Sequence, residues 1–83
     1  MKYPKIHAVT AKSLYILLVE FENQEKREYD VSKLLEKEMF APLKNPVLFK
    51  SCKIDTNGYA VIWNEDIDIS EYELWHNGRP VLN

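Results

Sequence analysis

The sequence predicts a small α+β domain: a mainly antiparallel sheet of about five or six strands in hairpins, two short helices in the middle of the chain and one short C-terminal helix. Two observations lead to this prediction. Apolar and polar residues alternate over several short segments, which is typical of strands with one buried face. Between Tyr29 and Asp55 the alternation stops and apolar residues take up helical spacing. We therefore expect this middle stretch to close the core over the strands.

The length of 83 residues is that of one small domain, and we expect residues 1–83 to fold as a single unit. A chain of this size buries only about 60 to 65% of the surface that its unfolded form exposes. Its stability should be modest, roughly 4 to 12 kcal/mol. With 46% hydrophobic and 12% aromatic residues, the chain has enough apolar material for a core.

Three strands are expected in the first part of the chain, at residues 6–11, 14–21 and 26–31. A tight turn at Lys12-Ser13 and a short polar loop would join them as neighbours. The second segment is apolar on both faces, which predicts a central strand. The third has a charged outer face of mixed sign, which is typical of a sheet edge.

The middle of the chain predicts two short helices. Asp30 or Ser32 is placed to cap the first helix, and Pro42 is expected to end it because proline disfavours the α conformation in the preceding residue. Asn45 and Pro46 then start the second helix, as an N-cap followed by proline at the first helical position. The expected apolar anchors of this stretch are Leu34, Leu35, Met39, Phe40, Leu48 and Phe49.

Three further strands are expected at residues 52–56, 59–63 and 66–69. Asn57-Gly58 predicts a two-residue type I′ turn between the first two, because that turn requires positive φ at both central residues. The last strand alternates strictly, with carboxylates on its outer face and isoleucines on its inner face.

The final helix is predicted by its two ends. Ser70 and Glu73 have capping-box spacing, in which the serine oxygen accepts from the amide three residues on and the glutamate reaches back. We expect the helix to run through Trp75 and to stop at Asn77-Gly78.

The charge balance argues against two classes of partner. Eleven basic and thirteen acidic side chains give a net charge of −2, without a run of either sign, so the basic footprint of a typical nucleic-acid binder is missing. No apolar segment approaches the roughly 20 residues of a membrane helix. Cys52 is the single cysteine and has no partner for an internal disulfide. The expectation is a soluble cytoplasmic protein without a membrane partner.

Each candidate catalytic or metal-binding group has a simpler structural interpretation. Asp66 and Asp68 leave one face of a predicted strand, but hard cations need several further oxygen ligands. His7 and His76 are far apart and have no second ligand at zinc-site spacing. Cys52 lies among core positions and is expected to act as a small buried hydrophobe. We therefore expect no enzyme activity, no cofactor and no metal.

Three phrases of the sequence, FENQEKREYDVSKLL, FAPLKNPVLFKSCKID and VIWNEDIDISEYELW, are characteristic when taken together. They resemble the domain-of-unknown-function 2442 family of small, mainly bacterial proteins, over roughly residues 5–75. In this family, glycine usually stands at the position of Gln24 and again near Glu65. Asn23 and Asn64 tolerate positive φ and would allow the same turns here.

The resemblance implies a small α+β domain of antiparallel strands with short helices. Some relatives carry an added helix-turn-helix domain, for which this chain has no room before Asn83. Others are encoded beside small partner proteins in arrangements similar to toxin–antitoxin pairs. The resemblance supplies no catalytic residues.

Binding is the class of function that the residues themselves favour. Tyr59, Trp63, Tyr72 and Trp75 supply large amphipathic side chains, which often anchor interfaces and are also needed for the core of so small a domain. The working hypothesis is a non-catalytic protein-interaction module whose partner is a small protein encoded nearby.

Two alternatives stay open. An exposed sheet face would bind nucleic acid if Lys26 and Arg27, or Lys44, Lys50 and Lys53, gather in space, although the slightly acidic balance disfavours this. An exposed strand edge would also allow a homodimer.

Overall fold

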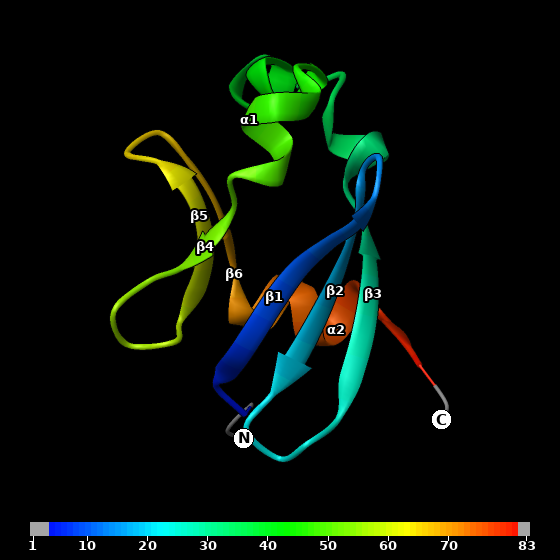
Figure 1. The fold of residues 1–83 in the computed structure, drawn as a ribbon, viewed down its shortest axis with the longest axis vertical. Helices are drawn as coiled ribbons and strands as arrows, with labels where there is room; N and C mark the ends of the chain where they lie inside the picture. The colour runs from blue at the N-terminus through cyan, green and yellow to red at the C-terminus, as the bar shows by residue number, and fades with distance from the viewer. Residues whose placement is uncertain (1–3, 82–83) are drawn as a thin grey trace.

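The alternating segments form two antiparallel sheets in the computed structural model, which describes residues 4–81 (Figure 1). The larger sheet has four strands, in the order β1-β2-β3-β7. β2 lies in its middle, as its apolar faces predict: Leu17, Val19 and Phe21 are no more than 1% exposed. The strands are β1 (Ile6–Ser13), β2 (Ile16–Phe21), β3 (Lys26–Asp30) and β7 (Arg79–Pro80).

The smaller sheet has three strands, in the order β4-β5-β6. Its inward residues are those that the alternation predicts, since Val61, Ile67 and Ile69 are all buried. The three strands are β4 (Lys53–Ile54), β5 (Ala60–Asn64) and β6 (Ile67–Ser70).

Short helical segments connect and cover the sheets. Two 3₁₀ segments, η1 (Val31–Leu34) and η2 (Glu38–Lys44), and the helix α1 (Pro46–Lys50) gather at one end of the molecule (Figure 1). The helix α2 (Glu71–Asn77) follows β6 and packs against β3. The α+β fold class is thus confirmed.

One core serves both sheets and the helical segments. Each of its members is less than a tenth exposed. The buried hydrophobic residues are Ile6, Leu17, Val19, Phe21, Tyr29, Val31, Leu35, Leu43, Phe49, Val61, Trp63, Ile67, Ile69 and Leu74.

The strand count rises to seven within the described residues because of β7, which the sequence does not predict. Arg79 and Pro80 pair with Glu28 and Arg27, so β3 is not the free edge that its charges suggest. A two-residue strand containing proline has no periodicity to detect, and only the return of the chain after α2 creates it.

The first predicted helix is wrong in type. The chain from Val31 to Lys44 forms two 3₁₀ segments instead of an α-helix, and Pro42 lies inside the second one. The capping prediction holds at Asp30, whose side chain accepts from the Ser32 amide at 2.9 Å. Met39 is 48% exposed and does not anchor the core, whereas Leu43 is completely buried. A 3₁₀ segment has three residues per turn, so it moves apolar positions to faces that 3.6-residue spacing does not predict.

Two predicted hairpin turns are also displaced. The first connection is Leu14-Tyr15, because Ser13 pairs with Ile16, and it leaves Leu14 53% exposed. Of Asn57-Gly58 only Gly58 has positive φ, at 76°. A type I′ turn is therefore excluded.

The loop between β4 and β5 instead runs from Asp55 to Ala60. The Gly58 amide donates to the Asp55 carbonyl at 3.1 Å, and the Asp55 side chain accepts from the Tyr59 amide at 2.7 Å. The Ile6 amide donates to the Gly58 carbonyl at 2.9 Å, so this loop also joins the smaller sheet to β1.

Both later helices begin where the sequence predicts. Asn45 caps α1, with Pro46 in its first turn. Ser70 caps α2 by accepting from the Glu73 amide at 3.1 Å, but the Glu73 side chain turns elsewhere and does not complete the box. The helix ends at Gly78, where a Cβ atom would lie 2.3 Å from the Leu74 carbonyl oxygen, so a side chain there requires the backbone to move.

Gln24 has positive φ, at 71°, in the loop between β2 and β3. Left-handed backbone costs a non-glycine residue about 1 to 2 kcal/mol. Asn23 was expected to allow this turn by adopting positive φ, but Gln24 adopts it instead. The Asn23 side chain accepts a hydrogen bond from the Glu25 amide at 3.0 Å.

We predict that Gln24→Gly raises the free energy of unfolding by about 0.5 to 1 kcal/mol, because glycine adopts positive φ without the steric cost. Urea denaturation measures the change. Glu22→Gly in the same loop is the matched control and should be neutral or destabilising, since Glu22 is outside the positive-φ region. Equal destabilisation by both substitutions would contradict the prediction.

Candidate functional site

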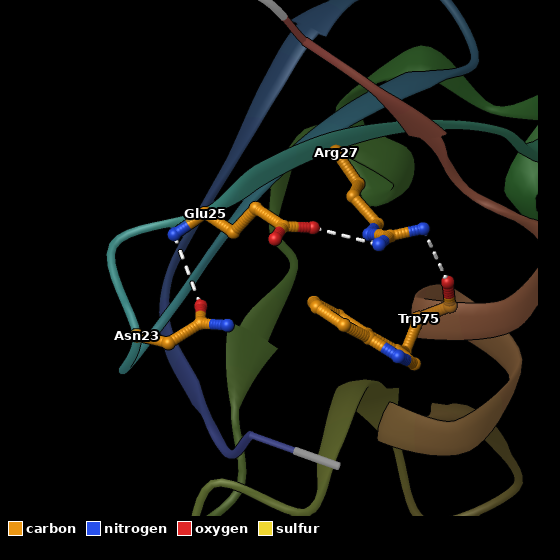
Figure 2. Close-up of polar contacts among 4 residues, drawn as sticks. All are labelled: Asn23, Glu25, Arg27 and Trp75. Carbon is orange, nitrogen blue, oxygen red and sulfur yellow. Dashed lines mark hydrogen bonds and ion pairs between the residues drawn. The ribbon is translucent and has the colours of Figure 1, made fainter.

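Arg27 ties α2 to the larger sheet. Its guanidinium carbon lies 3.8 Å from the centroid of the Trp75 ring, and its Nη1 donates to the Trp75 carbonyl at 2.8 Å (Figure 2). Nη2 donates to Glu25 at 2.6 Å. The cation–π contact and the carbonyl bond are the stronger pair, because Arg27 is only 16% exposed whereas Glu25 is 44% exposed and its ion pair is weakened by solvent.

Tyr29 makes a second connection between β3 and α2. Its hydroxyl donates to the Glu73 carboxylate at 2.7 Å, and Tyr29 is only 5% exposed. Burial, followed by the hydrogen bond to Glu73 and the negative charge of Glu73, raises the pKa of Tyr29 well above its usual value. The phenol therefore stays protonated, and it holds Glu73 at the edge of α2.

Two adjoining hollows lie beside this pair, and we call them together the β6 groove. The first has a volume of about 260 Å³ and is bordered by β6, α2 and the 3₁₀ segments. The second, of about 290 Å³, shares Tyr29, Leu34 and Glu73 with it. Its lining combines apolar and aromatic side chains with charged and polar ones. Its lining residues are Tyr29, Asp30, Lys33, Leu34, Lys37, Phe40, Asp68, Ile69, Ser70, Glu73 and Asn77.

The four aromatic residues expected at an interaction surface are placed in different environments. Trp63 is 6% exposed and its indole N–H donates to the Phe49 carbonyl at 2.8 Å, so it is part of the core. Trp75 is half-buried beneath Arg27 and meets Phe21 edge to face, with ring centroids 5.1 Å apart.

The two tyrosines of that set are exposed, Tyr59 by 47% and Tyr72 by 48%. The Lys5 ammonium lies 5.0 Å from the Tyr59 ring centroid. The rings of Tyr72 and His76 have centroids 4.2 Å apart. The backbones of their segments meet where the Glu71 amide donates to the Tyr59 carbonyl at 2.8 Å.

The groups weighed for catalysis or metal binding lie in different structural settings. Asp66 lies in the turn before β6, where its amide donates to Asn64, and Asp68 lies on β6 itself. Burial raises the pKa of the half-buried Cys52 thiol, which packs against the core. Within residues 4–81 no three His, Cys, Asp or Glu side chains form a group able to hold a metal ion.

Sequence reasoning did not bring the groove residues together. Leu34 and Phe40 were expected only as core anchors, and Asp68 only as the outer face of a strand. The alternation of residues 66–69 does show that Asp68 points outward, but its position opposite η1 and η2 follows from the packing of α2.

These features define a small α+β domain with a groove between a strand edge and a 3₁₀ wall. The family model described as a protein of unknown function (DUF2442) matches residues 6–80, and the chain belongs to this family. No curated protein and no solved structure matches the chain. Within the part of the chain that the structure describes, no helix has both the length and the apolar character needed to cross a membrane.

We predict that Arg27→Lys lowers the free energy of unfolding by about 1 to 2 kcal/mol, because a lysine ammonium cannot both stack on Trp75 and donate to its carbonyl with the same geometry. Urea denaturation followed by tryptophan fluorescence measures it. Arg79→Lys makes the same change at a residue whose side chain is 81% exposed, and it should cost less than about 0.5 kcal/mol. Equal costs would rule out the special role of Arg27.

We predict that Tyr29→Phe lowers stability at neutral pH by about 1.5 to 3 kcal/mol, the value of a hydrogen bond to a charged acceptor. Because the pKa of folded Tyr29 is raised, its contribution is complete below the unfolded pKa of about 10 and is lost as the pH rises above it. The difference between wild type and variant should therefore be constant from about pH 7 to 9 and shrink above about pH 10. A difference that does not change up to about pH 11 would contradict the assignment.

Proposed function

We propose that this protein is a non-catalytic protein-interaction module of the cytoplasm whose partner is another small protein, encoded nearby in an arrangement like that of a toxin–antitoxin pair. The observation that carries the proposal is the β6 groove, which combines apolar and charged lining residues with a neighbouring strand. Small-protein partners commonly use such a combination, with apolar anchors for affinity and rim charges for selection.

The chemistry of the groove favours binding over catalysis. The Tyr29 hydroxyl is engaged with Glu73 and its raised pKa makes it a poor general base near neutral pH. Glu73 is in turn occupied by this bond. The Ser70 hydroxyl is also engaged, because it caps α2 by accepting from the Glu73 amide at 3.1 Å.

Nucleic-acid binding is a second candidate, supported by one observation. Lys44, Lys50 and Lys53 are exposed on three elements that follow one another along the chain, η2, α1 and β4. The other basic pair considered is less available, because Arg27 is engaged with Trp75. A gel shift at low and at physiological salt tests this function, and no affinity at low salt would reject it.

We predict that the tagged full-length chain, expressed together with its neighbouring gene, recovers that gene's product in a stoichiometric complex. Size-exclusion chromatography with light scattering gives the composition and the mass. An unrelated domain of similar size and charge serves as the control bait. Repeated isolation of the chain alone would reject the proposed function, and a complex of two copies of the chain would replace it with a homodimer.

A further inference from the structure

β6 is the outer strand of its sheet: β5 lies on one side and no strand of the described residues lies on the other. The Glu71 amide donates to the Tyr59 carbonyl, and hydrogen-bonded pairs alternate along an antiparallel ladder. Val61 and Ile69 are therefore a hydrogen-bonded pair, and the opposed residues Ile62 and Asp68 are not. It follows that the N–H and C=O of Asp68 point away from β5, toward the open edge.

The open edge of β6 lies next to the β6 groove, whose lining includes Asp68, Ile69 and Ser70. The opposite wall is formed by Leu34 and Phe40, both half-buried, and by the exposed Lys37. A strand added to β6 would place alternate side chains on opposite faces of the sheet. Those on the face of Ile67 and Ile69 would enter the groove, and those on the other face would lie beside Asp68.

The charge around this edge indicates what the added strand carries. The segment from Ile54 to Gly78, which contains β5, β6 and α2, has six carboxylates and no lysine or arginine. The facing wall supplies two lysines, so the charged residues that line the groove are three carboxylates and two lysines: Asp30, Asp68, Glu73, Lys33 and Lys37. Asp68 stands exposed on the edge strand itself. Opposite charges across a strand pair stabilise it and like charges destabilise it, so a partner strand should have basic residues opposite Asp68.

We infer that the edge of β6 is the docking site for an extended segment of a basic protein partner, which adds to the sheet as a fourth strand with apolar residues in the β6 groove and lysine or arginine beside Asp68. This inference rests on the proposed function and gives that function a surface and a partner chemistry. Main-chain hydrogen bonds to Asp68 supply affinity, and the two faces supply selection.

A second copy of the chain fits this edge poorly. Two β6 strands paired about their centre would bring the Asp68 carboxylates of both copies onto one face, within the reach of like-charge repulsion. Exposed charges of this kind are a common means by which edge strands avoid self-association.

The test uses fluorescent nine-residue peptides that alternate lysine with valine, and a matched peptide with glutamate in place of lysine. We expect the full-length protein to bind the lysine peptide at least about tenfold more tightly, with an affinity that falls as salt is added. Failure of the lysine peptide to bind, or equal binding of both peptides, would overturn the inference.

Two substitutions at Asp68 test separately the contribution of its backbone N–H and the contribution of its charge. Asp68→Pro removes the outward N–H without removing a bond to β5, since that N–H does not face β5, and should weaken the lysine peptide by about tenfold or more. Asp68→Lys keeps the N–H and should reverse the preference toward the glutamate peptide. Glu22→Lys makes the same charge change in the loop after β2 and should leave the preference unchanged. Lysine-peptide binding to Asp68→Pro as tight as to wild type, or an unreversed preference in Asp68→Lys, would overturn the inference.

Used as baits in the co-expression experiment, the same variants keep the two proposals distinguishable. Recovery of the partner by wild type and equally by Asp68→Pro would overturn the docking site and leave the proposed function intact. Recovery of nothing by wild type would reject the function itself. Urea denaturation of Asp68→Pro verifies its fold, and if that variant does not fold, the reversal expected of Asp68→Lys decides the question.

Discussion

The contact of Arg27 with Trp75 is the interaction on which the arrangement of this small domain most depends. It joins β3 of the larger sheet to the helix that follows β6 of the smaller one, so it fixes how the two sheets face each other (Figure 2). Gly78 allows the backbone after α2 to lie close to β3, as this contact requires. A side chain at this position would clash with the Leu74 carbonyl and crowd the Arg27 Cβ. After that passage the chain returns along β3 as β7.

A domain of this size has few ways to hold two sheets together, and it uses several weak ones at once. The Ile6 amide of β1 donates to the loop between β4 and β5, and Tyr29 of β3 donates to Glu73 of α2. Trp63 of β5 donates to the Phe49 carbonyl, which ties the smaller sheet to α1. Each neutral bond of this kind contributes about 1 kcal/mol, and the bond to the charged Glu73 contributes more. Such values are a meaningful fraction of the stability expected for so short a chain.

The distribution of charge is a further constraint on what the protein can bind. Although the net charge is only −2, the two signs are unevenly distributed. Carboxylates predominate in β5, β6 and α2, and lysines predominate at the helical end. A surface of one sign selects partners of the other through encounter rate and through the cost of wrong pairings. Membership of a family of unknown function leaves the partner to be identified, and the groove and its charges give that search a chemical direction.

Local chemistry determined much of this structure before any tertiary contact is considered. The inward positions of β6 follow from strict alternation, the central place of β2 follows from apolar residues on both of its faces, and the caps at Asp30, Asn45 and Ser70 follow from side chains that accept a nearby amide. These features involve residues close in the chain, so a single sequence is enough to predict them.

Tertiary structure decided everything that joins distant residues. It converted the helix after Asp30 into 3₁₀ segments that bury Leu43 and expose Met39, and it placed positive φ on Gln24. Tertiary structure also decided that Trp63 belongs to the core, and it placed Phe40 beside β6, where the two border the groove. Periodicity records which face of a segment is apolar; which other segment covers that face depends on packing across the whole chain, and that information is not local.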